Sequence, residues 1–286
     1  DRTATTKAMR VAGGTSAAAL TLTDAVATRP QDTTYATLNG KLYVAYDSTV
    51  NFLHAFRPTV STTLMQRVGL ILPGAPTRAD AGGAGAYAAI ARYYRVQWLT
   101  VVSSVIQRQS NLGTAAAVFT PSGANANVTV TQPTAPSNGE THWIVWGSLD
   151  GVLYYNLSGQ IVIATTTYAD TTVTTSAVYT AKAAAPAEGA FTPWPSVKYL
   201  LSTGHRLLGF GVWGDTTSND IPTKNGRVYF SPVLDTSTSS GDDDERVSNT
   251  TEFQGWVDLS RNGGSEDRAI AGPIDDQILC FMSRGI

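Results

Sequence analysis

The feature that most constrains this chain is a repeated alternation of short apolar runs with dipeptides that favour tight turns. Asn39-Gly40, for example, separates the apolar segment Tyr35–Leu38 from Leu42–Tyr46. Asn-Gly favours a two-residue hairpin of type I′ because both of its residues tolerate a positive φ. The same turn chemistry recurs at Asp150-Gly151, at Asn225-Gly226 and at Asn262-Gly263-Gly264.

Helical patterns, by contrast, are nearly absent. The alanine-rich stretches Ala17–Ala19, Ala115–Ala117 and Ala183–Ala185 are short. None carries an apolar stripe with the period of about 3.6 residues that a buried helix needs. Tyr94–Trp98 instead shows a strand pattern, in which apolar residues expected to point inward alternate with polar residues expected to point outward. We therefore predict an all-β chain.

Composition excludes several classes of function. Charged residues make up 15% of the 286 residues, the net charge is −2, and lysine and arginine do not cluster. Proteins that bind nucleic acid tightly usually carry a basic excess or patch, so we do not expect that role. Cys280 is the single cysteine, which excludes an intrachain disulfide. No apolar run approaches the roughly 20 residues that span a bilayer, so we predict no membrane segment.

Two stretches rich in glycine, alanine and proline, Pro73–Ala86 and Lys182–Pro195, divide the chain. Between them the pattern predicts about seven short strands in about ninety residues, the size of one immunoglobulin-like or fibronectin-type-III-like sandwich. We therefore predict a sandwich over residues 84–172. It is inserted into another β domain, which consists of residues 1–83 and 173–286.

The flanking segments repeat one layout. Residues 35–46, 199–210 and 271–281 each contain an apolar strand, a tight turn and a second apolar strand. Recurrent antiparallel units of this kind are typical of β-propeller blades of about 40–50 residues. We predict that the flanks form about four or five such blades, at the small end of the range for propellers.

Four segments, taken in order, carry a resemblance to a known family. They are LNGKLYVAYDSTVNFLHAF, PSVKYLLSTGHRLLGFGVW, GRVYFSPV and AIAGPIDDQILCFMSRGI. The interrupting segment contributes YYRVQWL early and WGSLDGVLYYNL late. Together they resemble the β-propeller tail hub, or nozzle, proteins of tailed bacteriophages. Each segment is short and apolar, so the order of the segments is the stronger signal.

The resemblance implies a structural component of the virion. Copies would form a homo-oligomeric ring in the phage tail, next to other tail proteins or to portal and adaptor proteins. The genome would pass through this ring during ejection. The net charge of −2 agrees with transient passage of DNA without specific binding. No catalytic residue comes with the resemblance, and we predict that the chain is not an enzyme.

The three histidines, His54, His142 and His205, do not form a metal-binding motif. None lies at His-x-x-x-His spacing or beside a pair of cysteines. The Gly-x-Ser-x-Gly nucleophile elbow is also missing. We expect ordinary hydrogen-bonded histidines. We predict no catalytic, cofactor-binding or metal-binding residues and no cofactor.

The segment Ser148–Tyr154 is similar to the Asp-box of sialidase propellers. In this chain, however, the aspartate and the glycine are adjacent, and the trailing Thr-Trp is missing. A plain Asp-Gly hairpin explains the segment better. A glycosidase would also need two carboxylates about 5–10 Å apart across one cleft. Acidic residues in strand-like stretches are sparse, with Asp47 and Asp258 as examples.

Three further features have both a structural and a functional interpretation. Asp242–Glu245, four consecutive acidic residues, is interpreted as a solvated loop, with pairing to a basic patch on a partner as the functional alternative. Cys280 is expected to be buried on one face of a strand. If the chain is instead a carbohydrate- or receptor-binding β module, exposed aromatic residues would stack on sugars. Those candidates, otherwise expected to pack in the interior, are Trp194, Trp213 and Trp256.

Overall fold

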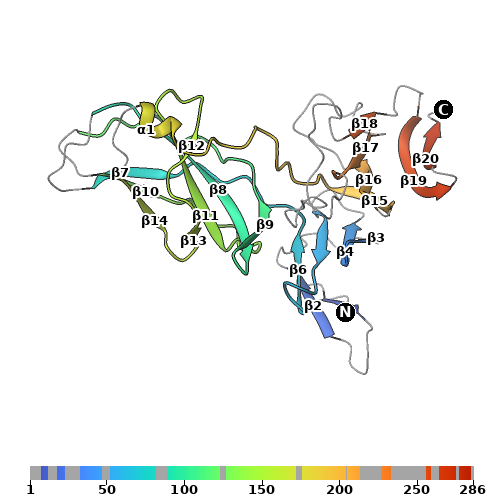
Figure 1. The fold of residues 1–286 in the computed structure, drawn as a ribbon. Helices are drawn as coiled ribbons and strands as arrows, with labels where there is room; N and C mark the ends of the chain where they lie inside the picture. The colour runs from blue at the N-terminus through green and yellow to red at the C-terminus, as the bar shows by residue number, and fades with distance from the viewer. Residues whose placement is uncertain are drawn as a thin grey trace. The chain divides into compact units, whose positions relative to one another are not determined.

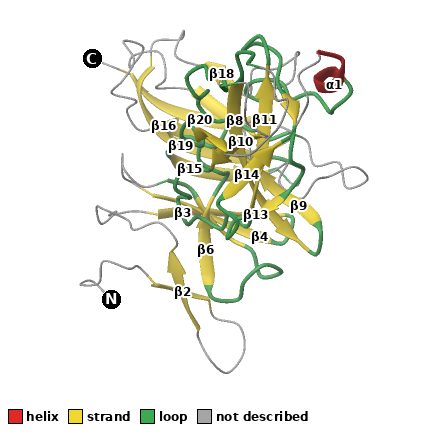
Figure 2. Cartoon of the chain, turned by 90° about the vertical axis from the view of Figure 1, so that its left-hand side faces the viewer, coloured by secondary structure: helices red, strands yellow, loops and turns green. Residues whose placement is uncertain are grey.

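A computed structural model of the chain describes residues 8–11, 18–22, 33–46, 52–81, 89–122, 127–171, 176–203, 205–212, 227–232, 256–258, 264–274 and 277–284. The described residues form the strands β1 to β20 and one short helix, α1 (Ser176–Thr180) (Figures 1 and 2). The prediction of an all-β chain is therefore confirmed. The predicted turns at Asn225-Gly226 and Asn262-Gly263 lie outside the described residues.

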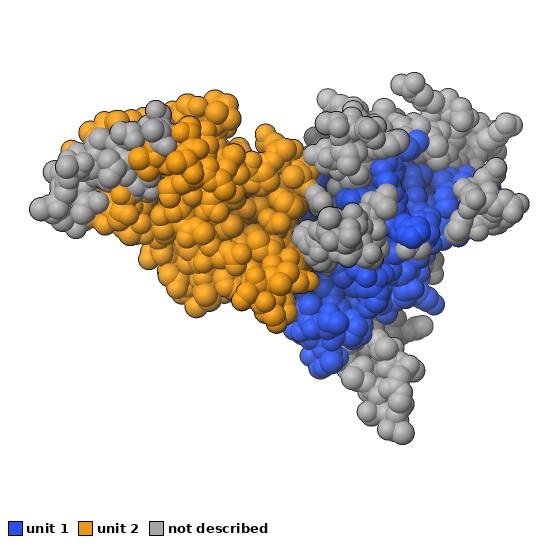
Figure 3. All heavy atoms as spheres, in the orientation of Figure 1, with its two compact units in different colours: residues 1–69, 192–286 blue, residues 70–191 orange. Residues whose placement is uncertain are grey.

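The chain divides into two compact units, which are coloured separately in Figure 3. Unit 1 comprises residues 1–69 and 192–286, and unit 2 comprises residues 70–191. Unit 2 is continuous in sequence and separates the two parts of unit 1. It contains the segment 84–172, for which the sequence predicts a sandwich, together with residues on both sides of that segment. The domain boundaries inferred from the sequence stay a prediction.

The first sheet of unit 1 has the strand order β1-β2-β6-β5-β4-β3. Its strands are β1 (Ala8–Val11), β2 (Ala18–Leu22), β3 (Thr33–Leu38), β4 (Lys41–Tyr46), β5 (His54–Phe56) and β6 (Leu64–Arg67). The β2–β6 pair is parallel, and the other neighbours are antiparallel. At the β3–β4 turn, Asn39 and Gly40 have φ angles of 51° and 71°, so the predicted type I′ hairpin is confirmed.

The second part of unit 1 contributes a four-stranded sheet, β15-β16-β17-β18, and a two-stranded sheet, β19-β20. Their bounds are β15 (Val197–Ser202), β16 (Leu207–Val212), β17 (Arg227–Phe230), β18 (Trp256–Asp258), β19 (Gly264–Ile274) and β20 (Gln277–Arg284). The core joins both parts of the unit, since Tyr43 and Leu53 belong to the same buried cluster as Trp194 and Leu207. A Cβ at Gly209 would lie 2.9 Å from the Trp194 ring, so glycine makes room for the tryptophan.

Unit 2 contains two sheets. The three-stranded sheet has the order β14-β10-β7, and the other has the order β12-β11-β8-β9, with β13 also paired to β11. Their bounds are β7 (Thr77–Ala81), β8 (Tyr93–Val102), β9 (Val105–Gln109), β10 (Asn127–Thr131), β11 (His142–Ser148), β12 (Tyr155–Asn156), β13 (Ile161–Val162) and β14 (Thr167–Asp170). All of the pairings in both sheets are antiparallel.

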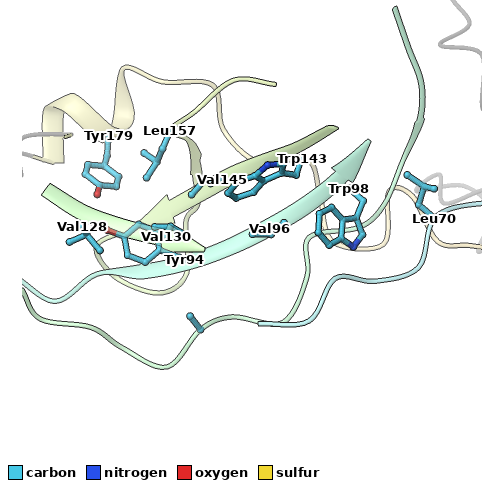
Figure 4. Packing of buried hydrophobic residues seen from close by; sticks show 11 residues of the cluster. Leu70, Tyr94, Val96, Trp98, Val128, Val130, Trp143, Val145, Leu157 and Tyr179 are labelled. Atoms are coloured by element: carbon cyan, nitrogen blue, oxygen red, sulfur yellow. The ribbon is translucent and has the colours of Figure 1, made fainter. Parts of the chain in front are cut away.

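The main core of unit 2 draws on both of its sheets (Figure 4). Tyr94, Val96 and Trp98 alternate along β8 and are at most 1% exposed, as their period of two predicts. They pack with buried residues of the neighbouring β11 and of β10 in the other sheet. Those residues are Trp143, Val145, Val128 and Val130.

The opposite face of β8 is also covered, which the sequence pattern did not indicate. Gln97 was expected to point outward, but it is 1% exposed, and its Nε2 donates to the carbonyl of Ser110 at 2.8 Å. Ser110 Oγ in turn accepts a hydrogen bond from the backbone N–H of Trp98 at 2.9 Å. The prediction was therefore wrong for Gln97, because the segment after β9 continues alongside β8 and its Ser110 carbonyl accepts the amide of this side chain.

A buried ion pair links the two sheets of unit 2. Arg92 Nη1 lies 3.3 Å from Asp170 Oδ2, and both side chains are 0% exposed. Tyr94 OH donates to the same Asp170 oxygen at 2.9 Å, and Arg92 Nη1 donates to Tyr179 OH at 2.8 Å. Burial raises the pKa of the Tyr179 phenol, so it stays protonated. One polar cluster thus connects β8, β14 and α1.

Candidate functional site

A groove with a volume of about 810 Å³ lies on unit 2. Arg95 lines it, and because Arg95 alternates along β8 with Tyr94 and Val96, it lies on the face of the sheet away from the main core. We call this site the Arg95 groove. The rest of its lining is Leu72 and the three segments 111–115, 152–155 and 184–189.

The 111–115 segment is held against β8 by backbone hydrogen bonds. Gly113 N–H donates to the carbonyl of Val96 at 2.7 Å, and Ala116 N–H donates to that of Tyr94 at 2.8 Å. A Cβ at Gly113 would lie 2.6 Å from the carbonyl oxygen of Pro73, so only glycine fits at this position. This wall of the groove therefore depends on the absence of a side chain.

The 152–155 segment is shaped by the carboxylate of Asp150. Its Oδ1 accepts hydrogen bonds from the backbone N–H groups of Val152 at 2.8 Å and Leu153 at 2.9 Å. Ser148 Oγ donates to the same oxygen at 2.8 Å. These bonds lower the pKa of Asp150, so the carboxylate is ionised at neutral pH. The motif Ser148–Asp150 thus acts as a turn cap.

The predicted two-residue hairpin at Asp150-Gly151 is wrong. Of these two residues only Gly151 has a positive φ, at 75°, whereas a type I′ turn needs two. Pairing of β11 with β12 begins at Gly147 and Tyr155, so the connection is longer than predicted. The side chain of Asp150 bonds to the backbone locally, and this competes with the tighter turn.

The 184–189 segment belongs to the alanine- and proline-rich stretch that follows α1. Ala185 N–H donates to the carbonyl of Tyr154 at 2.9 Å, and Asn156 N–H donates to that of Ala183 at 2.9 Å. Beyond the segment, Phe191 N–H donates to Asn111 Oδ1 at 2.8 Å. Hydrogen bonds therefore tie this wall to both of the other walls of the groove.

The positive charge in the groove comes from Arg95, which is half-buried. Its guanidinium carbon lies 5.0 Å from the centroid of the Tyr154 ring, within the range of a cation–π contact. No described carboxylate lies within ion-pair distance of Arg95. Burial raises the pKa of Tyr154 more than the nearby Arg95 lowers it, so the phenol stays neutral.

The edge of the groove is apolar and exposed. Among its lining residues, Leu72 is 51% exposed, Val152 is 76% exposed and Leu153 is 59% exposed. The described lining contains a single carboxylate, Glu188, and neither histidine nor cysteine. A glycosidase of the usual kind needs two facing carboxylates, and this lining supplies one.

The three histidines lie in different surroundings. His54 is buried, its Nδ1 lies 2.9 Å from the carbonyl oxygen of Phe52, and burial lowers its pKa to about 4. His142 Nδ1 lies 2.9 Å from Thr141 Oγ1, and His205 is exposed. In the part of the chain that the structure describes, no group of three or more histidine, cysteine, aspartate and glutamate residues is placed to hold a metal ion.

Of the three tryptophan candidates for sugar stacking, the structure describes the side chain of Trp194, and it does not support that role. Trp194 is 2% exposed and belongs to the core of unit 1, so the expectation that it packs is confirmed. Trp213, the side chain of Trp256 and the acidic run Asp242–Glu245 lie outside the described residues. Cys280 is partly exposed, so the expectation that it is buried was wrong.

Sequence reasoning did not find the Arg95 groove. Val152 and Leu153 gave no signal of it, because apolar residues directly after a turn dipeptide are also the pattern of a hairpin strand. No protein-family model, curated protein or solved structure matches the chain. Among the described residues, no helix is long and apolar enough to cross a lipid bilayer.

Proposed function

We propose that this chain is a structural protein of a tailed-bacteriophage virion and forms part of the ring of the tail hub, or nozzle, through which the genome passes. In this proposal the sheets of unit 1 are blades of a β-propeller. Unit 2 is an inserted sandwich of the immunoglobulin or fibronectin-type-III kind. The chain has no catalytic role.

The observation that carries the proposal is the way the chain is divided. An all-β unit, residues 70–191, is enclosed in sequence between two parts of a second all-β unit. The resemblance to tail hub proteins has the same order, with propeller-like segments on both sides of a sandwich-like segment. Agreement in the order of several weak segments is more specific than any one of them.

Exposed apolar side chains on unit 1 support an interface with neighbouring copies of the chain. Tyr35 is 69% exposed, and Leu279 and Phe281 on β20 are 40% and 50% exposed. Among the described strands, β19 and β20 pair only with each other. A ring requires an interface between two different faces of the same chain, and open sheet edges with apolar residues suit that role.

The second hypothesis, a carbohydrate- or receptor-binding module, is favoured by one observation, the Arg95 groove. Its large exposed residues are aliphatic rather than aromatic, and the Tyr154 ring already contacts Arg95. Stacking on sugars needs a free aromatic face, so this hypothesis ranks below the first. The propeller glycosidase ranks third.

Immunogold labelling would test the proposal directly. Antibodies raised against the purified chain would be applied to phage particles from the source of the sequence, and the particles would be examined by negative-stain electron microscopy. We expect gold at the tail, and cryo-EM should show a ring of copies around the tail axis. Unlabelled particles, or a monomeric spike at the periphery of the tail, would overturn the proposal.

A further inference from the structure

We propose that the Arg95 groove binds an extended peptide segment of a partner protein, in which one carboxylate is flanked by aliphatic side chains. This inference goes beyond the proposed function, since it requires neither a virion nor a ring. Three independent features of the groove carry it: its charge, its exposed apolar residues and its prior organisation.

The positive charge of Arg95 favours an anion in the ligand, although the lining also contains the carboxylate of Glu188. Arg95 is half-buried, and no described carboxylate lies within ion-pair distance of it. Withdrawal from water strengthens the attraction between a cation and an approaching anion. A guanidinium also binds a carboxylate through two parallel hydrogen bonds, which fixes the orientation of the ligand.

The apolar part of the lining favours a peptide over a sugar. Leu72, Val152 and Leu153 are each more than half exposed, and they all line this one groove. Clustered exposed aliphatic residues mark sites of protein contact. The walls are otherwise rich in glycine and alanine, which leaves room for an extended backbone. These small residues are Gly113, Ala115, Ala184, Ala185, Ala187 and Gly189.

The groove is formed before a ligand arrives. Hydrogen bonds tie the 111–115 wall to β8, the 184–189 wall to Tyr154, and Phe191 to Asn111. Asp150 fixes the backbone that carries Val152 and Leu153. Because these walls are already ordered, a peptide would lose little affinity to ordering of the protein.

The first experiment selects peptides from a random seven-residue library on the full chain. We expect the enriched sequences to share one aspartate or glutamate flanked by aliphatic residues, and the enrichment to disappear with Arg95→Gln. The matched control is Arg78→Gln, because Arg78 also lies over an aromatic ring, 5.9 Å from the Phe119 centroid, but does not line the groove. Failure to enrich any sequence, or enrichment of sequences without an acid, would overturn the proposal.

The second experiment measures fluorescence anisotropy with an enriched peptide and with its counterpart in which the acid is replaced by its amide. Loss of the charge should weaken binding to the wild-type chain by about tenfold. Arg95→Gln should abolish this difference, and Leu153→Ser, a change at an exposed position, should weaken both peptides. Equal weakening by Arg78→Gln, or displacement of the peptide by glucuronate or N-acetylneuraminate, would refute the peptide assignment. The sugar outcome would assign the groove to acidic glycans instead.

Discussion

Replacing Asp170 with asparagine tests whether the buried ion pair holds the two sheets of unit 2 together. The change keeps the size of the side chain and an oxygen that can accept from Tyr94, but it removes the negative charge 3.3 Å from Arg92. Two unit charges at that distance attract by about 5 kcal/mol at an effective dielectric constant of about 20. Removing one partner of a buried pair destabilises a protein by about 3–5 kcal/mol, and we expect a loss in this range.

Hydrogen exchange of the amides in β8 and β10 is the appropriate assay. The chain has two compact units, so a single unfolding midpoint does not isolate the stability of unit 2. A loss of about 3 kcal/mol or more predicts amide exchange that is at least about a hundredfold faster than in the wild type. The control is Thr167→Ala, an exposed change on the same strand, which should alter stability by less than about 0.5 kcal/mol.

A double variant separates the lost attraction from other effects of the substitution. Combining Asp170→Asn with Arg92→Met removes both charges, so that no uncompensated charge stays buried. We therefore expect the double variant to be less destabilised than the sum of the two single variants. Amide exchange in Asp170→Asn close to the wild-type rate, or strict additivity of the two changes, would refute the reasoning.

Three further predictions concern unit 1 and the whole chain. Because burial lowers the pKa of His54 from 6.5 to about 4, unit 1 should keep its full stability above pH 6.5 and lose up to about 3 kcal/mol as the pH falls from 6.5 to 4. Amide exchange in β4 and β5 should therefore depend less on pH in His54→Gln than in the wild type. In the control His205→Gln its dependence on pH should equal that of the wild type. Gly209→Ala, which places a Cβ 2.9 Å from Trp194, should destabilise unit 1 by about 1–3 kcal/mol, and amide exchange in β15 and β16 at the wild-type rate would contradict the overlap. In a gel shift at about 150 mM salt, the chain should bind duplex DNA poorly. Sub-micromolar binding would contradict the proposal that DNA passes through the ring without being held.

Features set by local chemistry were predictable from the sequence. The hairpin at Asn39-Gly40 follows from two residues that both accept a positive φ. The buried set Tyr94, Val96 and Trp98 follows from a period of two, which identifies one face of a strand wherever the strand lies in the fold. All-β character is the sum of many such local preferences, which is why it could be read without a structure.

Features set by tertiary contacts were not predictable. Gln97 is buried and bonds to the Ser110 carbonyl after β9, and the alternation of residues in β8 gives no sign of this contact. The Arg95 groove likewise brings together segments from before β7, after β9, before β12 and after α1. Neither its arginine nor its aliphatic residues indicate a site in the sequence, because they form one only when the fold brings them together.

The division of unit 1 affects the order in which the protein can fold during synthesis. Thr34 Oγ1 donates to the carbonyl of Lys198 at 2.6 Å, and the two residues are 164 positions apart. At about 5–20 residues per second, a ribosome needs roughly 8–33 s to supply that partner. Unit 2 is continuous and can fold in the interval, whereas Tyr43 and Leu53 must wait for Trp194 and Leu207. During this wait the nascent chain is most open to aggregation and to chaperone binding.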